Sequence, residues 1–332
     1  MPEPRISALL CSFNRRHFLK RALESLEAQT VGMRNFEVVV VDDGSTDGTS
    51  ELEAEFRGRL QLRWARQENM GLAAAKNLAI RQARAPILAF LDDDDIASPN
   101  LLEEHLRAHA DHPMLEVAVL GFTDLSPEVA EQPIMHFVTE VGFYLFCYPK
   151  MRDGEMLNHT YLWGGRSSCK AALLHGIEGP FDPDFRFGCE DIELGHRLRT
   201  RGLRVLYRKA ARSTMIRAMT LDDVCRRAER QGESNWVFLT KHPCDAVRQW
   251  AQLEQLEASW RSIEGRMHLM MASARGLDTI VRARRRHSVP VEPQLMAMLH
   301  ESYWAVIDAH RIRGSWRSMQ SAPSNACSAG SA

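Results

Sequence analysis

The sequence lacks three features, each of which would indicate a class of protein. Neither charge is in excess, because 42 Lys and Arg residues stand against 43 Asp and Glu residues and give a formal net charge of −1. Proteins that bind a nucleic-acid duplex usually present a strongly basic face, so this balance argues against a nucleic-acid partner. No apolar run approaches the roughly 18 residues that a membrane-spanning helix needs, so none is expected.

Paired cysteines are the third missing feature. Seven cysteines are scattered along 332 residues, in an odd number and without a C-x-x-C pair. Such a set fits neither a disulfide framework nor a zinc knuckle. The opening residues also differ from a signal peptide, because an acidic residue flanked by prolines precedes an apolar stretch that is too short. The sequence therefore predicts a cytoplasmic protein.

The first 122 residues alternate between two patterns. Apolar runs typical of buried strands lie at Ile6–Leu10, Phe36–Val41 and Pro86–Leu91. Apolar residues recur at helical spacing over 18–26, and an alanine-rich helical segment covers Leu72–Ala83. Strands and helices in this order predict an α/β fold, with a mainly parallel sheet covered by helices.

The pattern changes in the second half of the chain. Residues 123–180 mix glycine, proline and aromatic residues, and helical spacing returns at about residue 191. From about residue 216 almost every segment has helical periodicity, and the last residues, SAPSNACSAGSA, are small and polar. We therefore expect an α/β domain over 1–215, a helical C-terminal extension over 216–318 and a disordered tail over 319–332.

The first acidic motif is VVVVDDGSTDGT, in which a predicted buried strand ends at Asp42 and Asp43. In open α/β sheets, ligands bind outside the carboxyl ends of the strands, where a carboxylate can accept hydrogen bonds from a nucleobase or a ribose. Asp, Gly and Ser also favour turns, so the motif equally fits a strand-to-helix turn without a ligand. Both interpretations stay open on these residues alone.

The second acidic motif is AFLDDDDIASP, where Asp92, Asp93, Asp94 and Asp95 directly follow an apolar run. Adjacent carboxylates repel one another, and such a cluster is costly unless a cation neutralises it. Mg²⁺ and Mn²⁺ suit oxygen ligands best. The alternative is a solvated acidic loop, which the adjoining buried strand makes less favoured. The motif therefore predicts a divalent metal site.

The third acidic motif is FRFGCEDIELGHRLRTRG, where Glu190 and Asp191 stand at the predicted start of a helix. Carboxylates in a first helical turn interact favourably with the helix dipole, which is a purely structural role. A carboxylate within reach of a hydroxyl could instead act as a general base. The motif by itself does not decide between these roles.

In this order, about fifty and a hundred residues apart, the three motifs resemble glycosyltransferase family 2. The resemblance covers roughly residues 5–210 and includes SALLCSFNRRHFLKRALESLEAQT, ENMGLAAAKNLAI and LAFLDDDDIASPNLLE. Members of that family have a GT-A fold, a Rossmann-like sheet flanked by helices, and transfer a sugar from a nucleotide-sugar with inversion. The resemblance implies a nucleotide-sugar half over about 1–122 and an acceptor half over about 123–215.

The resemblance also implies a role for each matching residue. Asp191 matches the general base, with Glu190 beside it, and Asp94 matches the direct metal ligand, together with Asp92. The residues implied in binding the nucleotide-sugar are Ser12, Phe13, Asp42, Asp43, Lys76, Asn77, Asp92 and Asp93. The residues that lie where family members have acceptor loops are Trp163, Gly164 and Gly165. Trp163 either stacks on a sugar ring or packs in the core.

The chain departs from this pattern at one place. Many GT-A enzymes supply a late His or acidic ligand to the metal, but here the corresponding segment reads LYRKAARSTMIRAM. Two explanations are open. The metal is held loosely, chiefly by the diphosphate and Asp94, or basic residues of this segment take part of its role, with Arg208, Lys209 and Arg212 as candidates.

The helical extension suggests further partners. A basic run over 282–287 would suit contact with an anionic membrane surface at the inner face, although such runs are more often solvated helix faces. Apolar stripes at helical spacing in the extension could pair between subunits and form a homodimer.

These expectations combine into one predicted function. The sequence predicts a metal-dependent, inverting hexosyltransferase that uses a nucleotide-diphosphate sugar, with a UDP-sugar favoured, Mn²⁺ or Mg²⁺ as cofactor and an unidentified hydroxyl acceptor. The alternative from another class is a catalytically inactive GT-A-like binding or scaffold protein, which the missing metal ligand keeps open. A phosphatase or hydrolase that uses the acidic cluster is a further alternative.

Overall fold

The computed structural model describes residues 3–253 and 255–321, which form two compact units. The first unit comprises the chain up to Pro127, with Lys150–Arg186 and Glu190–Arg217. The second comprises Glu128–Pro149, Phe187–Cys189 and the chain from Ala218 onward. The chain leaves the first unit for the last time after Arg217, two residues beyond the expected boundary at 215. The division into donor and acceptor halves stays a prediction.

The first unit is built on a sheet with the strand order β3-β2-β1-β4-β8-β6-β9-β5. β1 pairs in parallel with both β2 and β4, and β2 pairs in parallel with β3, as the alternating pattern predicts. The strands are β1 (Ile6–Ser12), β2 (Phe36–Asp42), β3 (Leu62–Arg66), β4 (Ile87–Leu91), β5 (Asp95–Ala97), β6 (Val117–Leu125), β7 (Met156–Leu157), β8 (Ser167–Lys170) and β9 (Arg204–Met215).

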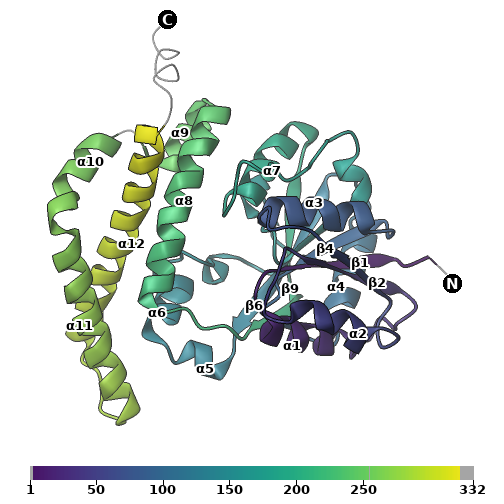
Figure 1. Cartoon of the computed structure of the whole chain (residues 1–332), viewed down its shortest axis with the longest axis horizontal. Helices are drawn as coiled ribbons and strands as arrows, with labels where there is room; N and C mark the ends of the chain where they lie inside the picture. Colours follow the sequence, from purple (N-terminus) through teal and green to yellow (C-terminus); the bar gives the residue numbers. More distant parts are fainter. Residues whose placement is uncertain (1–2, 254, 322–332) are drawn as a thin grey trace, which may run out of the picture. The chain divides into compact units, whose positions relative to one another are not determined.

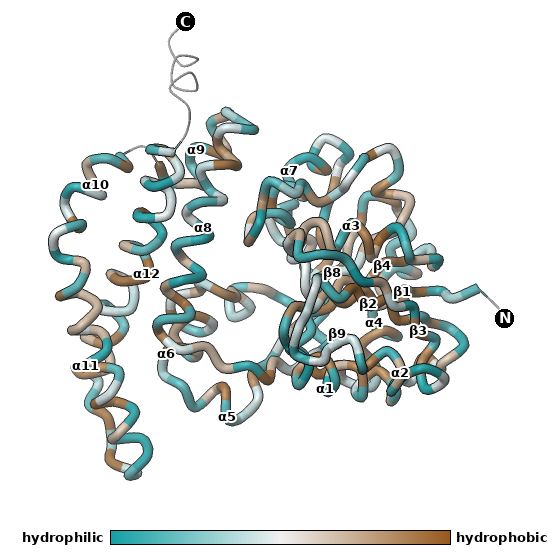
Figure 2. Tube along the Cα trace, viewed as in Figure 1, coloured by the Kyte–Doolittle hydropathy of each residue, from teal (hydrophilic) through white to brown (hydrophobic). Residues whose placement is uncertain are grey.

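Helices cover this sheet on both faces. In Figure 1, α3 lies on one face, and α1 and α2 lie on the other. The helices of this unit are α1 (Arg16–Leu26), α2 (Leu52–Phe56), α3 (Leu72–Gln82), α4 (Leu101–Asp111) and α7 (Glu190–Leu198). Every residue of β2 is buried, which explains its four consecutive valines, and Figure 2 shows hydrophobic residues along β1 and β2. The predicted α/β fold is confirmed.

No clear sequence pattern predicts the antiparallel part of the sheet. β8 lies between β4 and β6 and runs antiparallel to both. The three-residue strand β5 pairs with the end of β9, and β7 pairs with another part of β9. These strands are short, so they carry little periodicity that a sequence pattern could reveal. They matter because they bring the segment before β8 beside the end of β4.

The second unit is helical. Its helices are α6 (Pro133–His136), α8 (Leu221–Lys241), α9 (Asp245–Ala251), α10 (Leu256–Ile263), α11 (Met267–Arg286) and α12 (Pro293–Ser321), and α5 (Pro127–Ala130) begins at the last residue of the first unit's opening segment. Thr220 and Asp223 form a capping box that starts α8. Glycines let α8 and α12 approach closely, since a Cβ on Gly232 would lie 1.9 Å from the Arg311 carbonyl oxygen.

The helical extension is therefore present, although α12 reaches Ser321 and so includes the first three residues of the tail expected from 319. The rest of that tail, 322–332, lies outside the described residues. Figure 2 shows hydrophilic and hydrophobic residues alternating along α11 and α12. Among the described residues, no helix combines the length and the apolar character needed to cross a bilayer. The six described cysteines are free thiols.

Candidate active site

Three parallel strands end at the same edge of the sheet and set the position of the site. Ser12 at the end of β1 stands opposite Asp42 at the end of β2, and Leu10 of β1 stands opposite Leu91 at the end of β4. The residues that follow these strands are therefore neighbours, as expected at the carboxyl edge of an open α/β sheet. The first two acidic motifs both lie at this edge.

Asp42 and Asp43 have different surroundings. Asp42 is fully buried, and its Oδ1 accepts a hydrogen bond from the Ser45 main-chain N–H at 2.8 Å, so it fixes the turn after β2. Asp43 accepts hydrogen bonds from the Gln67 side chain at 2.7 Å and from the Met70 and Gly71 main-chain N–H groups at 3.0 Å. It therefore orders the loop that leads into α3. That either residue contacts a nucleotide stays a prediction.

The residues after β1 connect this edge to the acidic cluster Asp92–Asp95. The Ser12 hydroxyl donates a hydrogen bond to Asp93 Oδ2 at 2.7 Å, so Ser12 positions an acidic side chain. Phe13, the next residue, is 44% exposed, which is unusual for a phenylalanine and leaves its ring accessible. Stacking of that ring on a nucleobase stays a prediction.

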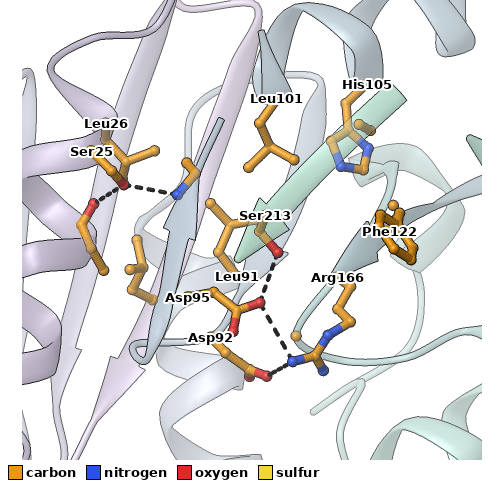
Figure 3. A pocket seen from close by; sticks show the side chains of 16 residues that line it. Ser25, Leu26, Leu91, Asp92, Asp95, Leu101, His105, Phe122, Arg166 and Ser213 are labelled. Carbon is orange, nitrogen blue, oxygen red and sulfur yellow. Dashed lines mark hydrogen bonds and ion pairs between the residues drawn. The ribbon is translucent and has the colours of Figure 1, made fainter. Parts of the chain in front are cut away.

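Each carboxylate of the acidic cluster has a guanidinium close to it. Arg166 Nη2 lies 2.8 Å from Asp92 Oδ2 and 3.5 Å from Asp95 Oδ2. Figure 3 marks the ion pairs of Arg166 with these two aspartates. Arg15 Nη1 lies 2.8 Å from Asp93 Oδ1. The third guanidinium, from Arg217, bonds to Asp94 Oδ2 through Nε. The structure thus neutralises most of the repulsion within the cluster.

The sequence analysis assigned none of these three arginines to the acidic cluster, and two of the candidates that it named instead have other partners. Arg208 pairs with Glu104 at 2.7 Å, and Arg212 pairs with Asp124. Arg217 lies in the same segment as these candidates, a few residues further on, and pairs with Asp94. That basic residues of this segment replace a metal ligand stays a prediction. No sequence pattern links Arg15 to the acidic cluster, because it stands in a loop 78 residues before Asp93.

The cluster has the donor set for a hard divalent cation. Asp92, Asp94 and Asp95 each offer a carboxylate oxygen, and these oxygens lie within 4.8 Å of one another. Asp95 Oδ1 is buried and has no hydrogen-bond partner in the part of the chain that the structure describes. Burial raises the pKa of Asp95 to about 7 and that of Asp93 to about 6. Carboxylate oxygens in this arrangement fit Mg²⁺ or Mn²⁺.

The third acidic motif begins α7 and is tied to α3. Lys76 Nζ lies 2.8 Å from Glu190 Oε1, and both side chains are almost completely buried. Asp191 accepts hydrogen bonds from the main-chain N–H groups of Gly164 and Ile192, each at 2.8 Å. Burial and the Glu190 carboxylate raise the pKa of Asp191, while Lys76 acts in the opposite direction.

Gly164 and Gly165 join the second and third motifs. The Gly165 carbonyl accepts the main-chain N–H of Asp92 at 3.1 Å, and the Gly164 N–H donates to Asp191 Oδ2. A Cβ on Gly165 would lie 2.1 Å from Asp92 Oδ1, and a Cβ on Gly164 would lie 2.3 Å from Lys76 Nζ. Only glycine therefore fits at these two positions without displacing the carboxylate or the ammonium.

Pockets lie against the same residues. One encloses about 370 Å³, including space open to solvent, and its lining includes Asp92, Asp95 and Arg166 (Figure 3). Another encloses about 250 Å³ by the same measure and is lined in part by Asp92, Lys76 and Gly164. Asp92, a member of the acidic cluster, thus lines both pockets, and the second pocket also contacts Lys76.

Two other predicted residues have contacts within the protein. The Asn77 amide donates to the Phe181 carbonyl at 2.6 Å and accepts the Phe181 N–H at 2.9 Å, so it anchors the loop before α7. Trp163 is half-buried, and its ring centroid lies 5.9 Å from that of Tyr161. Binding of the nucleotide by Asn77 and of the acceptor by Trp163 stay predictions.

Comparison with known proteins identifies the family. Glycosyl transferase family 2 matches residues 7–169, which include the first two acidic motifs and Gly164–Gly165. The chain belongs to glycosyltransferase family 2. Two curated relatives, both called validoxylamine A glucosyltransferase, come from Streptomyces hygroscopicus subsp. jinggangensis and subsp. limoneus. Each is 35% identical over 222 residues, covering 60% of this chain and 52% or 49% of the relative. The chain thus spans about half the length of these relatives.

Two solved structures show the same fold. A mannosyltransferase from Pyrobaculum calidifontis, PcManGT in complex with GDP-Man and Mn²⁺, superposes with a TM-score of 0.60 at 18% identity, covering 96% of this chain and 88% of that one. TarS 1–349 of S. aureus in complex with UDP superposes with a TM-score of 0.52 at 18% identity, covering 95% and 92%. These likenesses support the GT-A fold.

Proposed function

We propose that this chain is an inverting glycosyltransferase that moves a sugar from a nucleotide-diphosphate sugar to an acceptor hydroxyl, with Asp191 as general base. The observation that carries the proposal is the role of Gly164–Gly165. One glycine holds the predicted base, and the other contacts Asp92 of the acidic cluster. A base and a cation-binding cluster are thus joined by two adjacent residues, although they are about a hundred residues apart in the sequence.

Inverting transfer needs two different groups on opposite faces of the sugar. The base removes the proton from the acceptor hydroxyl on one face while the diphosphate leaves from the other. Asp191 suits the first task, because main-chain N–H groups fix both of its oxygens and its raised pKa makes it a better proton acceptor than an ordinary aspartate. Lys76 and Glu190 hold the start of α7 beside it.

The acidic cluster suits the second task. Asp92, Asp94 and Asp95 would hold Mn²⁺ or Mg²⁺, which stabilises the negative charge on the leaving diphosphate. The solved structures with this fold support such a donor, since their titles name GDP-Man with Mn²⁺, UDP and UDP-GlcNAc. The curated relatives are named for transferring glucose, so UDP-glucose belongs among the first donors to test.

Titration calorimetry with UDP, GDP, TDP and CDP, each with and without Mn²⁺, tests the donor site. We expect one diphosphate to bind, more tightly with Mn²⁺, and Asp94→Ala to abolish the effect of the metal. Asp124→Ala is the matched control, because Asp124 pairs with Arg212 and is no member of the cluster.

Absence of binding to every diphosphate, in a protein shown to be folded, would favour the scaffold alternative. Analysis of products separates transfer from hydrolysis. A glycosylated acceptor supports the proposal, whereas free sugar as the sole product, with acceptors supplied, would favour a hydrolase.

A further inference from the structure

The acidic cluster is paired with positively charged side chains of the same chain. Four carboxylates, Asp92–Asp95, are paired with the guanidinium groups of Arg15, Arg166 and Arg217, so the formal charge of the group is 3 − 4 = −1. All three carboxylates that could hold a metal lie within ion-pair distance of an arginine. A divalent cation therefore meets a nearly neutral group in which each of the three carboxylates is already paired with an arginine through one oxygen.

Arg217 is the least firmly held of these arginines. Arg166 contacts Asp92 and Asp95, donates to Thr123 at 2.7 Å, and has a side chain only 11% exposed. Arg15 lies near both Asp93 and Asp94. The Arg217 side chain is 24% exposed, less than the 37% of Arg15, but among the described residues it pairs with one carboxylate alone, that of Asp94.

The main chain around Arg217 also allows its side chain to move alone. The Ile216 N–H donates to the Asp94 carbonyl at 2.9 Å, which fixes the chain just before Arg217. Arg217 is the last residue of the first unit, directly after this anchor. Release of its guanidinium from Asp94 needs only rotation of the side chain and breaks one ion pair.

We propose that Arg217 is the exchangeable counter-cation of Asp94. It occupies Asp94 Oδ2 in the absence of donor and yields that oxygen to a divalent cation. The released guanidinium then binds a phosphate of the donor, since its fork of N–H groups matches phosphate oxygens. This last step rests on the proposed function, whereas competition between Arg217 and the cation does not. Cation and nucleoside diphosphate consequently bind cooperatively.

The competition is tested without any nucleotide. Mn²⁺ alone is titrated into the full chain at fixed pH, and free Mn²⁺ is measured by electron paramagnetic resonance. Arg217→Gln should bind Mn²⁺ about tenfold more tightly than the wild type, because a charge-assisted bond to Asp94 no longer competes. Arg212→Gln, the control, should stay within about twofold, because its partner is the exposed Asp124.

The second arm adds UDP or GDP at saturating Mn²⁺. Arg217→Gln should weaken binding of the diphosphate that the wild type prefers by about tenfold, because a charged hydrogen bond to phosphate is lost. The diphosphate affinity of Arg217→Lys should lie between those of the wild type and Arg217→Gln, since lysine keeps the positive charge but lacks the forked N–H groups of arginine. Circular dichroism and thermal melting verify that each variant is folded.

Each outcome has a defined meaning. Equal or weaker Mn²⁺ binding by folded Arg217→Gln overturns the exchange, and if that variant does not fold, the same result in Arg217→Ala, which also removes the charge, overturns it. Unchanged diphosphate affinity in Arg217→Gln overturns the phosphate contact. If Mn²⁺ binds more tightly to Arg217→Gln but no diphosphate binds even the wild type, the exchange stands and the proposed donor site fails.

Discussion

Substitution of Gly165 by alanine is the sharpest perturbation that the site offers. The added Cβ would lie 2.1 Å from Asp92 Oδ1 and 2.3 Å from Asp92 Cγ. Non-bonded carbon atoms normally stay about 3.5 Å apart, so the carboxylate has to move by roughly 1 Å. Asp92 cannot move freely, because its main-chain N–H is bonded to Gly165 itself and its carboxylate is paired with Arg166.

The size of the effect follows from this overlap. Overpacking of this kind costs about 1–3 kcal/mol of folding free energy. At about 2–4 °C per kcal/mol for a domain of 150–250 residues, the melting temperature of the first unit should fall by roughly 2–12 °C. A misplacement of about 1 Å in a catalytic constellation can cost roughly 100-fold in rate, so we expect a loss of that order in sugar transfer by Gly165→Ala.

Thermal melting and donor titration measure both effects, with Gly276→Ala as the control. Gly276 lies within α11, and no described atom would lie within 4 Å of its added Cβ. Alanine inside a helix is favoured over glycine by about 0.5–1 kcal/mol, so this variant should melt slightly higher and keep wild-type activity. The reasoning is refuted if Gly165→Ala melts and binds the donor as the wild type does.

The remaining predictions concern pH. Transfer by the wild type should rise with pH on an acid limb that lies above the ordinary pKa of an aspartate, because the base acts only when deprotonated and burial raises the pKa of Asp191. Lys76→Met should move that limb to higher pH, since Lys76 lowers this pKa, and should destabilise the fold by about 3–5 kcal/mol because Glu190 is left buried and unpaired. The double variant Lys76→Met/Glu190→Gln removes both charges and should return the limb toward its wild-type position. Rate–pH profiles decide, and a limb that stays in place in Lys76→Met argues against Asp191 as the base.

The parallel half of the sheet could be predicted because each of its buried strands has a similar, mainly apolar sequence. Buried parallel strands are apolar on both faces, so the four consecutive valines that end at Val41 and the neighbouring apolar segments stand out in the sequence. The acidic residues that follow these strands also stand out, because charge directly after a buried run is uncommon. Both signals depend on residues that are close together in the sequence.

The rest of the site depends on contacts that no local pattern carries. Gly164 and Gly165 were expected to contact the acceptor, yet the structure gives them a second role, as the link between Asp92 and Asp191. Arg15 and Arg217 both contact the acidic cluster, although Arg15 lies near the start of the first unit's sequence and Arg217 is its last residue. An arginine in a loop has the same local sequence whether it is solvated or paired, so only the fold reveals its partner.

The measurement that tests the central claim most directly compares donor binding with transfer in Asp191→Asn. Asp184→Asn, at an exposed carboxylate in the loop that precedes α7, is the matched control. We expect Asp191→Asn to bind the nucleotide diphosphate within about twofold of the wild type and to lose transfer by about 10²–10⁴-fold, the range that a general base contributes. Full turnover in Asp191→Asn, in a protein that binds the donor normally, would contradict the account.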